Sequence, residues 1–146
     1  MKKGGFTLLE LIIVIIIIGV LATLGFAQYG RMIEKSRGAE ARMVSGTIRT
    51  LSAAYRLENG NSLAGFAAAN AGIGAATDQI PSACRGTHYF SYALTPDPVV
   101  STTQLVVTAA RCTASGKSPN AAAANTLILT AELSTGSDTW GGNGGY

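Results

Sequence analysis

The chain has 146 residues, a formal net charge of +3 at pH 7 and a sequence pI of about 9.1. Lys2 and Lys3 account for two of the positive charges, so the remaining side chains sum to +1 and the basic pI does not indicate a nucleic-acid partner. His88 is the one histidine and the two cysteines are not in a Cys-x-x-Cys spacing, so the sequence predicts no metal site and no cofactor.

Residues 11–30 form a run of twenty residues without a charged side chain. As a helix at ~1.5 Å per residue, the run covers roughly 30 Å, the thickness of a bilayer's hydrocarbon core. The sequence therefore predicts contact with a membrane. Glu10 directly precedes the run, where a charged side chain costs on the order of a few kcal/mol unless it finds a partner.

A short basic leader stands before this run, with Lys2 and Lys3 followed by Gly5-Phe6-Thr7-Leu8-Leu9-Glu10. This arrangement closely resembles the class III signal of type IV pilins and of the related type II secretion pseudopilins. The resemblance implies that a prepilin peptidase cuts between Gly5 and Phe6 and that the new amine of Phe6 is methylated. It also implies that Glu10 neutralises the amino terminus of a neighbouring subunit during assembly.

Two alternatives remain for this segment. Glu10 lies four residues after Phe6, on the same helical face, and an acid there offsets both the Phe6 amine and the positive end of its own helix dipole, a role within one subunit. The start of the chain also has features of an ordinary secretory signal peptide, with a basic start and Gly25-Phe26-Ala27 as a small-x-small cleavage site. The apolar run exceeds the ~7–15 residues typical of such peptides, and an acid at Glu10 is unusual in them.

Inside the run the sequence departs from the pilin pattern. Many type IV pilins carry a proline where this chain has Ala27, and the segment between Gly19 and that position loses helicity in some filaments. Gly25 and Gly30 add weak points at about 1 kcal/mol each relative to alanine. Whether this helix melts on assembly is an open question at this point.

The helix is predicted to continue beyond the membrane. Residues 31–58 contain no proline, and Val44, Ile48, Leu51 and Tyr55 recur at spacings that form one apolar stripe, which we expect to face a sheet. Asn59-Gly60-Asn61 then supplies residues that end helices. The basic residues of this part are expected to form a solvated face at the headgroup level or to pair with acids of neighbouring subunits: Arg31, Lys35, Arg37 and Arg42.

The rest of the chain is predicted to be a loop followed by three strands. Residues 59–81 are rich in small and polar residues and read as a loop with a short turn of helix. β-like runs follow at 88–94, 104–110 and 126–133, separated by turn residues at 95–98 and 117–120. Covered by the helix stripe, they predict an α+β head on an antiparallel sheet. The glycine-rich end has one large residue, Trp140, expected to cap the core.

Cys84 precedes the first predicted strand and Cys112 follows the second. If the head lies outside the cytoplasm, the two cysteines should form a disulfide, worth roughly 3–4 kcal/mol of loop-closure entropy. The alternative is a pair of buried free thiols.

The sequence gives no support to catalysis. It has no G-x-S-x-G elbow, and Gly116-Lys117-Ser118 lacks the first glycine of a P-loop, whose position holds Arg111. We therefore expect a structural protein and not an enzyme. An adhesive or DNA-uptake pilin would show an exposed basic or aromatic cluster, and the candidates Arg85, His88, Tyr89 and Arg111 are too scattered in sequence to establish one.

The resemblance thus implies an α+β type IV pilin fold in which a long N-terminal helix has a protruding, membrane-spanning first half and a second half packed on a small sheet. It implies a homo-oligomeric filament subunit, stored in the bacterial inner membrane and carried by pilus assembly machinery to the cell surface. A minor pilin, a pseudopilin and a tip pilin remain alternatives. The expected divisions are a leader (1–5), a filament-core helix (6–30), its amphipathic continuation (31–58), a connecting loop (59–87) and the head with its tail (88–146).

Overall fold

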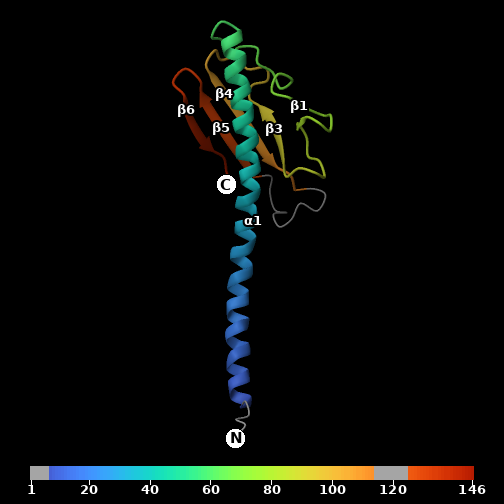
Figure 1. Ribbon diagram of the computed structural model, residues 1–146, viewed down its shortest axis with the longest axis vertical. Coiled ribbons are helices and arrows are strands. Elements are labelled where there is room, and N and C mark those ends of the chain that lie inside the picture. The colour runs from blue at the N-terminus through green and yellow to red at the C-terminus, as the bar shows by residue number, and fades with distance from the viewer. Residues whose placement is uncertain (1–6, 114–124) are drawn as a thin grey trace, which may run out of the picture. The chain divides into compact units, whose positions relative to one another are not determined.

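The computed structural model of the protein describes residues 7–113 and 125–146 (Figure 1). The chain divides into two compact units, Met1–Ile33 and Glu34–Tyr146, and one helix, α1 (Leu8–Glu58), contributes residues to both. The described residues that follow α1 form six strands: β1 (Ile73–Gly74), β2 (Ile80–Pro81), β3 (Phe90–Leu94), β4 (Gln104–Arg111), β5 (Thr126–Glu132) and β6 (Ser137–Gly141). The predicted α+β fold, with one long helix and a small antiparallel sheet, is confirmed.

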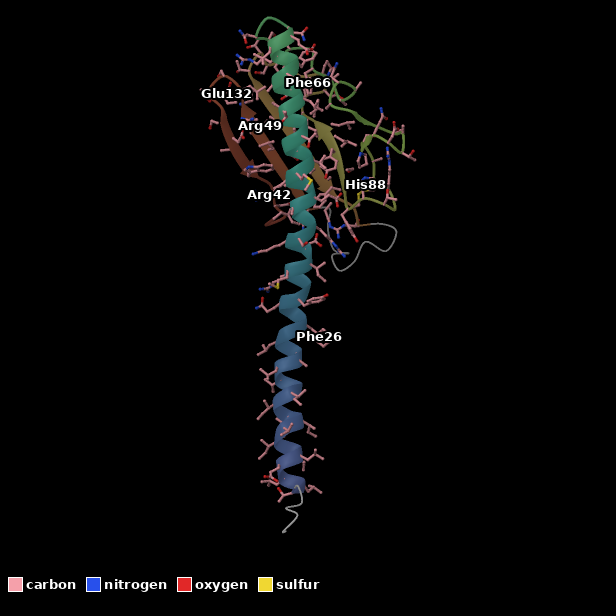
Figure 2. All side chains as sticks on the ribbon, viewed as in Figure 1. Phe26, Arg42, Arg49, Phe66, His88 and Glu132 are labelled. Carbon is pink, nitrogen blue, oxygen red and sulfur yellow. A yellow bond between two sulfur atoms is a disulfide. The ribbon has the colours of Figure 1, made fainter. Side chains whose placement is uncertain are left out.

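The first unit contains the apolar part of α1. Every large apolar side chain from Leu8 to Tyr29 is at least 43% exposed, and Phe26, at 78%, points away from the helix (Figure 2). The many isoleucines lower helix propensity slightly in water. In the hydrocarbon core of a membrane the helix is nevertheless favoured, because a single segment can hydrogen-bond all its backbone N–H and C=O groups there only as a helix. By length and composition α1 can cross a membrane.

The second unit is built on a four-stranded antiparallel sheet in the order β3-β4-β5-β6. Alternate residues of β3, β4 and β5 are buried. Helix α1 lies across one face of the sheet (Figure 1). The predicted strands at 88–94, 104–110 and 126–133 correspond to β3, β4 and β5, with ends that differ by one or two residues. The predicted turn at 117–120 lies outside the described residues.

The buried face of α1 differs from the predicted stripe. Ile48 is fully buried and Val44 and Tyr55 pack partly against the core, but Leu51 is 40% exposed. The fully buried positions of this segment follow the same 4, 3, 4 spacing on a face turned by roughly 60°, at ~100° per residue: Ala41, Ser45, Ile48 and Ser52. Three of these side chains are small, so the helix backbone approaches the sheet closely and the strands supply the bulk of the core.

The segment between α1 and β3 contributes to the core as well. Gly60 and Asn61 have positive φ angles of 65° and 64°, which ends α1 as the sequence predicted. Leu63 and Phe66 are fully buried, and the Phe66 ring meets Tyr55 edge-on at 5.3 Å between centroids. Two short strands, β1 and β2, pair in parallel here, where the sequence suggested only a loop with a helical turn.

Strand β6 was not predicted. It pairs with β5 from Ile128 and Gly141 to Glu132 and Ser137, after a turn in which Gly136 has a φ of 74°. All its residues are exposed, so the segment has no apolar alternation from which a strand can be recognised. The edge of β5, and not the side-chain pattern, is what makes this segment a strand. The interpretation of Trp140 as a core cap is therefore wrong, since it stands on this strand and is 38% exposed.

The position of the buried helix face can be tested with a matched pair of substitutions. We expect Ile48→Ala to lower the free energy of unfolding by about 2–5 kcal/mol, because it leaves a cavity between α1 and the sheet. Leu51→Ala should change it by about 0.5 kcal/mol or less, as is usual at the surface. Denaturant unfolding of the detergent-solubilised chain, followed by near-ultraviolet circular dichroism, measures both. Equal losses would contradict the observed face.

Candidate functional site

The N-terminus of α1 is capped by two side chains three residues apart. The Thr7 backbone N–H and hydroxyl both donate to Oε2 of Glu10, at 2.9 and 2.8 Å. The Thr7 hydroxyl in turn accepts the Glu10 backbone N–H at 3.3 Å. This is a capping box, in which threonine and glutamate satisfy each other's free backbone donors at a helix N-terminus.

The capping box gives Glu10 a role within its own helix. Both hydrogen bonds from Thr7 reach the same oxygen, Oε2, and within residues 7–113 and 125–146 no donor is seen for Oε1. A carboxylate has about four acceptor positions, so one oxygen can cap the helix while the other binds a cation. The Thr-x-x-Glu signal stands in the sequence, but sequence reasoning weighed only the charge of Glu10. Gly5 and Phe6, the predicted cleavage residues, lie outside the described residues.

Cys84 and Cys112 are joined by a disulfide, with their Cα atoms 5.5 Å apart. Cys112 is buried at the end of β4, and its backbone N–H donates to the Tyr89 carbonyl at 2.8 Å. Cys84 lies in the exposed segment before β3. The bond therefore ties the segment that enters the sheet to the strand beside it.

A buried ion pair connects β4 to α1. Nε of Arg111 lies 2.6 Å from Oε1 of Glu34, and the Arg111 side chain has no exposed surface. Arg111 also donates to the Cys112 carbonyl, next to the disulfide. Arg37 lies 3.5 Å from the same carboxylate and stacks over Tyr89 at 4.3 Å. The sequence offers Arg111 only as one of four scattered candidates for an exposed cluster, because a charge at the end of a strand carries no signal of burial.

The Glu34 carboxylate lies where its charge is favoured. Partial burial raises its pKa, but the hydrogen bonds and charge of Arg111, helped by the Tyr146 hydroxyl and Arg37, outweigh burial and hold the pKa below its ordinary value of 4.5. The Tyr146 hydroxyl donates to Oε1 of Glu34 at 3.2 Å. Burial and the neighbouring Glu34 charge raise the pKa of Tyr146 to about 12. The Glu34 carboxyl is therefore ionised and the Tyr146 hydroxyl neutral at neutral pH.

Three of the four residues considered for nucleic-acid or adhesive binding make contacts within the head. Arg85 donates to the carbonyls of Gly74 and Ala76 at 2.6 and 2.5 Å. Arg111 is buried, and Nδ1 of His88 lies 2.8 Å from the Thr87 hydroxyl. The described part of the chain contains no group of three or more His, Cys, Asp or Glu side chains that could hold a metal.

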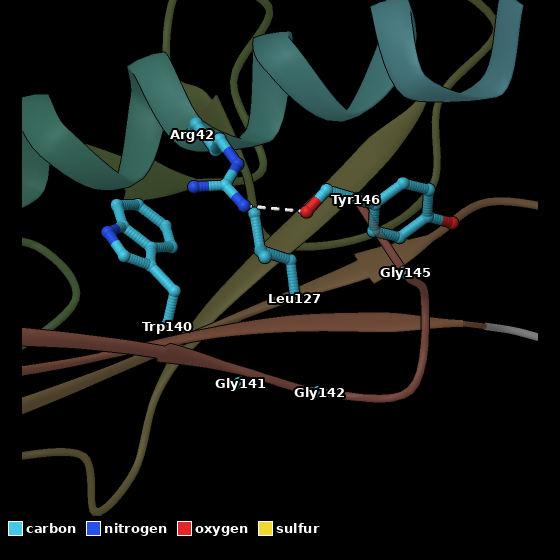
Figure 3. Close-up of a pocket in the computed structure, with 7 residues that line it drawn as sticks. All are labelled: Arg42, Leu127, Trp140, Gly141, Gly142, Gly145 and Tyr146. Atoms are coloured by element: carbon cyan, nitrogen blue, oxygen red, sulfur yellow. Dashed lines mark hydrogen bonds between the residues drawn. The ribbon is translucent and has the colours of Figure 1, made fainter. Parts of the chain in front are cut away.

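A small hollow lies between α1 and the β6 edge (Figure 3). Its volume is about 150 Å³, and its walls include the side chains of Arg42, Trp140 and Leu127 and the backbone of Gly141. The Arg42 guanidinium carbon lies 4.9 Å from the centre of the Trp140 ring, and Nη2 donates to the Tyr146 backbone oxygen at 2.6 Å. Arg42, like Arg37, is thus held on an aromatic ring of the head.

The geometry described so far, a capped N-terminus followed by a membrane-length apolar helix and an α+β head, agrees with the comparison with known families. Residues 1–26 match the family model of the prokaryotic N-terminal methylation motif. The chain therefore carries the class III signal that is the hallmark of type IV pilins and pseudopilins. Proteins of this type are structural and generally not enzymes.

The Glu34–Arg111 pair predicts a pH-dependent stability. Because the pKa of Glu34 is lowered in the folded state, its contribution is complete above the ordinary pKa of 4.5 and is lost as the pH falls through the lowered value. We expect Glu34→Gln to cost about 3–5 kcal/mol at pH 7, since it leaves Arg111 buried without a counter-charge.

Unfolding free energies of the wild type and Glu34→Gln, measured in detergent from pH 7 to pH 3, test this. The difference should shrink below about pH 4.5. Glu58→Gln, which removes an exposed acid of the same helix, is the control and should change stability little at either pH. A difference that stays constant with pH would contradict the pair.

Proposed function

We propose that this chain is the structural subunit of a type IV pilus-like filament. The observation that carries the proposal is the methylation motif at residues 1–26, in which the Gly5–Phe6 junction precedes the capped, membrane-length helix. The precursor is held in the inner membrane by residues 11–30 and is cut after Gly5 by a prepilin peptidase, and the Phe6 amine is methylated. The assembly machinery then moves the mature subunit from the membrane to a surface filament.

The apolar helix alone does not select one arrangement of subunits. Its surface is as well accommodated by lipid tails as by other apolar helices, so moving it from the membrane to a bundle changes hydrophobic burial little. Direction and register must come from polar groups. Within the apolar part of α1, between Leu8 and Gly30, Glu10 is the single charged residue.

The capping box explains how Glu10 can serve both its own helix and a neighbour. Thr7 holds the Oε2 atom, which fixes the carboxylate at the positive end of the helix dipole. Oε1 is then available to the Phe6 amine of an incoming subunit. A charged amine in an apolar bundle is strongly unfavourable without a counter-ion, so each added subunit is placed where its amine meets this oxygen.

Glu10→Gln removes the charge but keeps the helix cap, because glutamine also serves at the N3 position of a capping box. We expect the variant to be inserted and processed normally but to fail in assembly, since every addition step buries an uncompensated amine at several kcal/mol. Filaments are counted by electron microscopy after shearing, and leader removal is checked by mass spectrometry.

The matched control is Thr7→Ala, which weakens the cap by about 1 kcal/mol and keeps the charge. Processed Thr7→Ala should still form filaments. Normal numbers of normal-length filaments from fully processed Glu10→Gln subunits would refute the intersubunit role and leave Glu10 with the cap alone.

A further inference from the structure

The Arg42 hollow has the chemistry of a carboxylate site. A guanidinium carries five N–H donors in a planar fork, and the structure shows one of those of Arg42 donated, from Nη2 to the Tyr146 backbone oxygen. The remaining donors lie at a hollow of about 150 Å³ with room for a side chain as small as aspartate. The described residues place no acidic side chain within ion-pair distance of Arg42.

Arg42 is also held in place before any ligand arrives. The Arg42 guanidinium lies over the Trp140 ring and is hydrogen-bonded to the Tyr146 backbone oxygen (Figure 3). An arginine whose rotamer is already restricted loses less conformational entropy on binding than a free surface arginine. The hollow is also open at Gly141, because a Cβ added at this residue meets no atom within 4 Å.

The opposite edge of the head carries an acid that suits this hollow. Asp78 lies in the turn between β1 and β2, and residues 75–78 are all exposed. β2 lies next to β3, the sheet edge opposite β6, and Figure 1 shows β1 and β6 on opposite sides of α1. The described residues show no partner for the Asp78 carboxylate, and its neighbours Ala75, Ala76 and Thr77 are small enough to approach a surface closely.

Other acids of the head are less suited to the hollow. Asp138 is paired with Arg49 at 2.7 Å, and Asp97 accepts the Ala68 backbone N–H at 3.0 Å. Glu132 accepts the Ser134 hydroxyl at 2.7 Å. Glu58 is exposed but is the last residue of α1, so it lies on the helix and not on the edge of the head opposite β6.

We propose that the Arg42 hollow of one subunit receives Asp78 of a second copy of this chain. The contact joins two different edges of identical heads, which is a heterologous interface. Such an interface repeats without limit when its rotation does not close, as a helical filament requires. The inference rests on the proposed filament function and assigns the side-to-side contact of the heads, whereas Glu10 and Phe6 concern the helices.

Cross-linking tests this contact directly. The chain's own cysteines are bonded to each other, so introduced cysteines supply the reactive thiols. Sheared filaments of Thr77→Cys/Gly141→Cys, which keeps Asp78, are treated with a short bismaleimide and separated under denaturing conditions. We expect a ladder of dimers, trimers and longer products, because each head offers one thiol at each edge.

The controls identify the kind of contact. Each single variant should remain monomeric, and Glu58→Cys/Gly141→Cys, which moves the thiol to the helix end, should give no ladder. Adding Arg42→Glu to the double-cysteine chain removes the carboxylate site and should lower the cross-linked fraction at least about tenfold, because its negative charge no longer attracts the acidic edge. The charge exchange Arg42→Glu with Asp78→Arg, made without cysteines, should restore the filament yield that either change alone reduces.

Three results would overturn the proposal, and they are distinguishable from one another. Normal filaments that give no ladder would exclude the Arg42–Asp78 contact and leave the filament function intact. Absence of filaments from the wild-type chain would reject both. Dimers from Thr77→Cys alone would show that the β1–β2 turn of one copy meets the same turn of another, which also contradicts the proposal.

Discussion

The constraint on which the rest of this structure depends is the uncharged run at residues 11–30, which cannot remain in water. Its large apolar side chains are exposed along the whole run, and each buried one contributes about 1.5–3 kcal/mol relative to exposure. Lipid and a bundle of like helices are the two surroundings that remove this surface from water. In the proposed function, the charged and polar groups at the start of α1 decide when and where the helix moves from lipid to the bundle.

The head achieves a stable fold with few large residues on its helix. The small side chains of Ser45 and Ser52 let α1 lie close to the sheet. Phe66, in the segment between α1 and β3, adds a large buried side chain to the core. The Glu34–Arg111 pair and the disulfide then fasten the same end of β4, one to α1 and the other to the segment before β3. A small domain with a limited core commonly needs such additional links.

Much of this could be predicted from the sequence, where the signals are local. The apolar run, the Gly60-Asn61 helix end and the alternation in β3, β4 and β5 each follow from residue type and spacing. β6 could not be predicted, because its residues pair with β5 without burying a side chain. The exposure of Leu51 shows that the most apolar stripe of a helix is not always its buried face. Here the small side chains of Ser45 and Ser52 let the helix backbone approach the sheet more closely. The burial of Arg111 depends on a partner 77 residues away in the chain.

The central claim, that the chain is a precursor cut between Gly5 and Phe6 before its helix enters a filament, is tested most directly by the N-terminus of the exported protein. Surface filaments are sheared from cells, and the N-terminal peptide is identified by mass spectrometry. The account predicts that the peptide begins at Phe6 and carries a methyl group on its amine. An exported form that begins at Gln28, after the small-x-small sequence, would show that the apolar run is a secretory signal and would contradict the account.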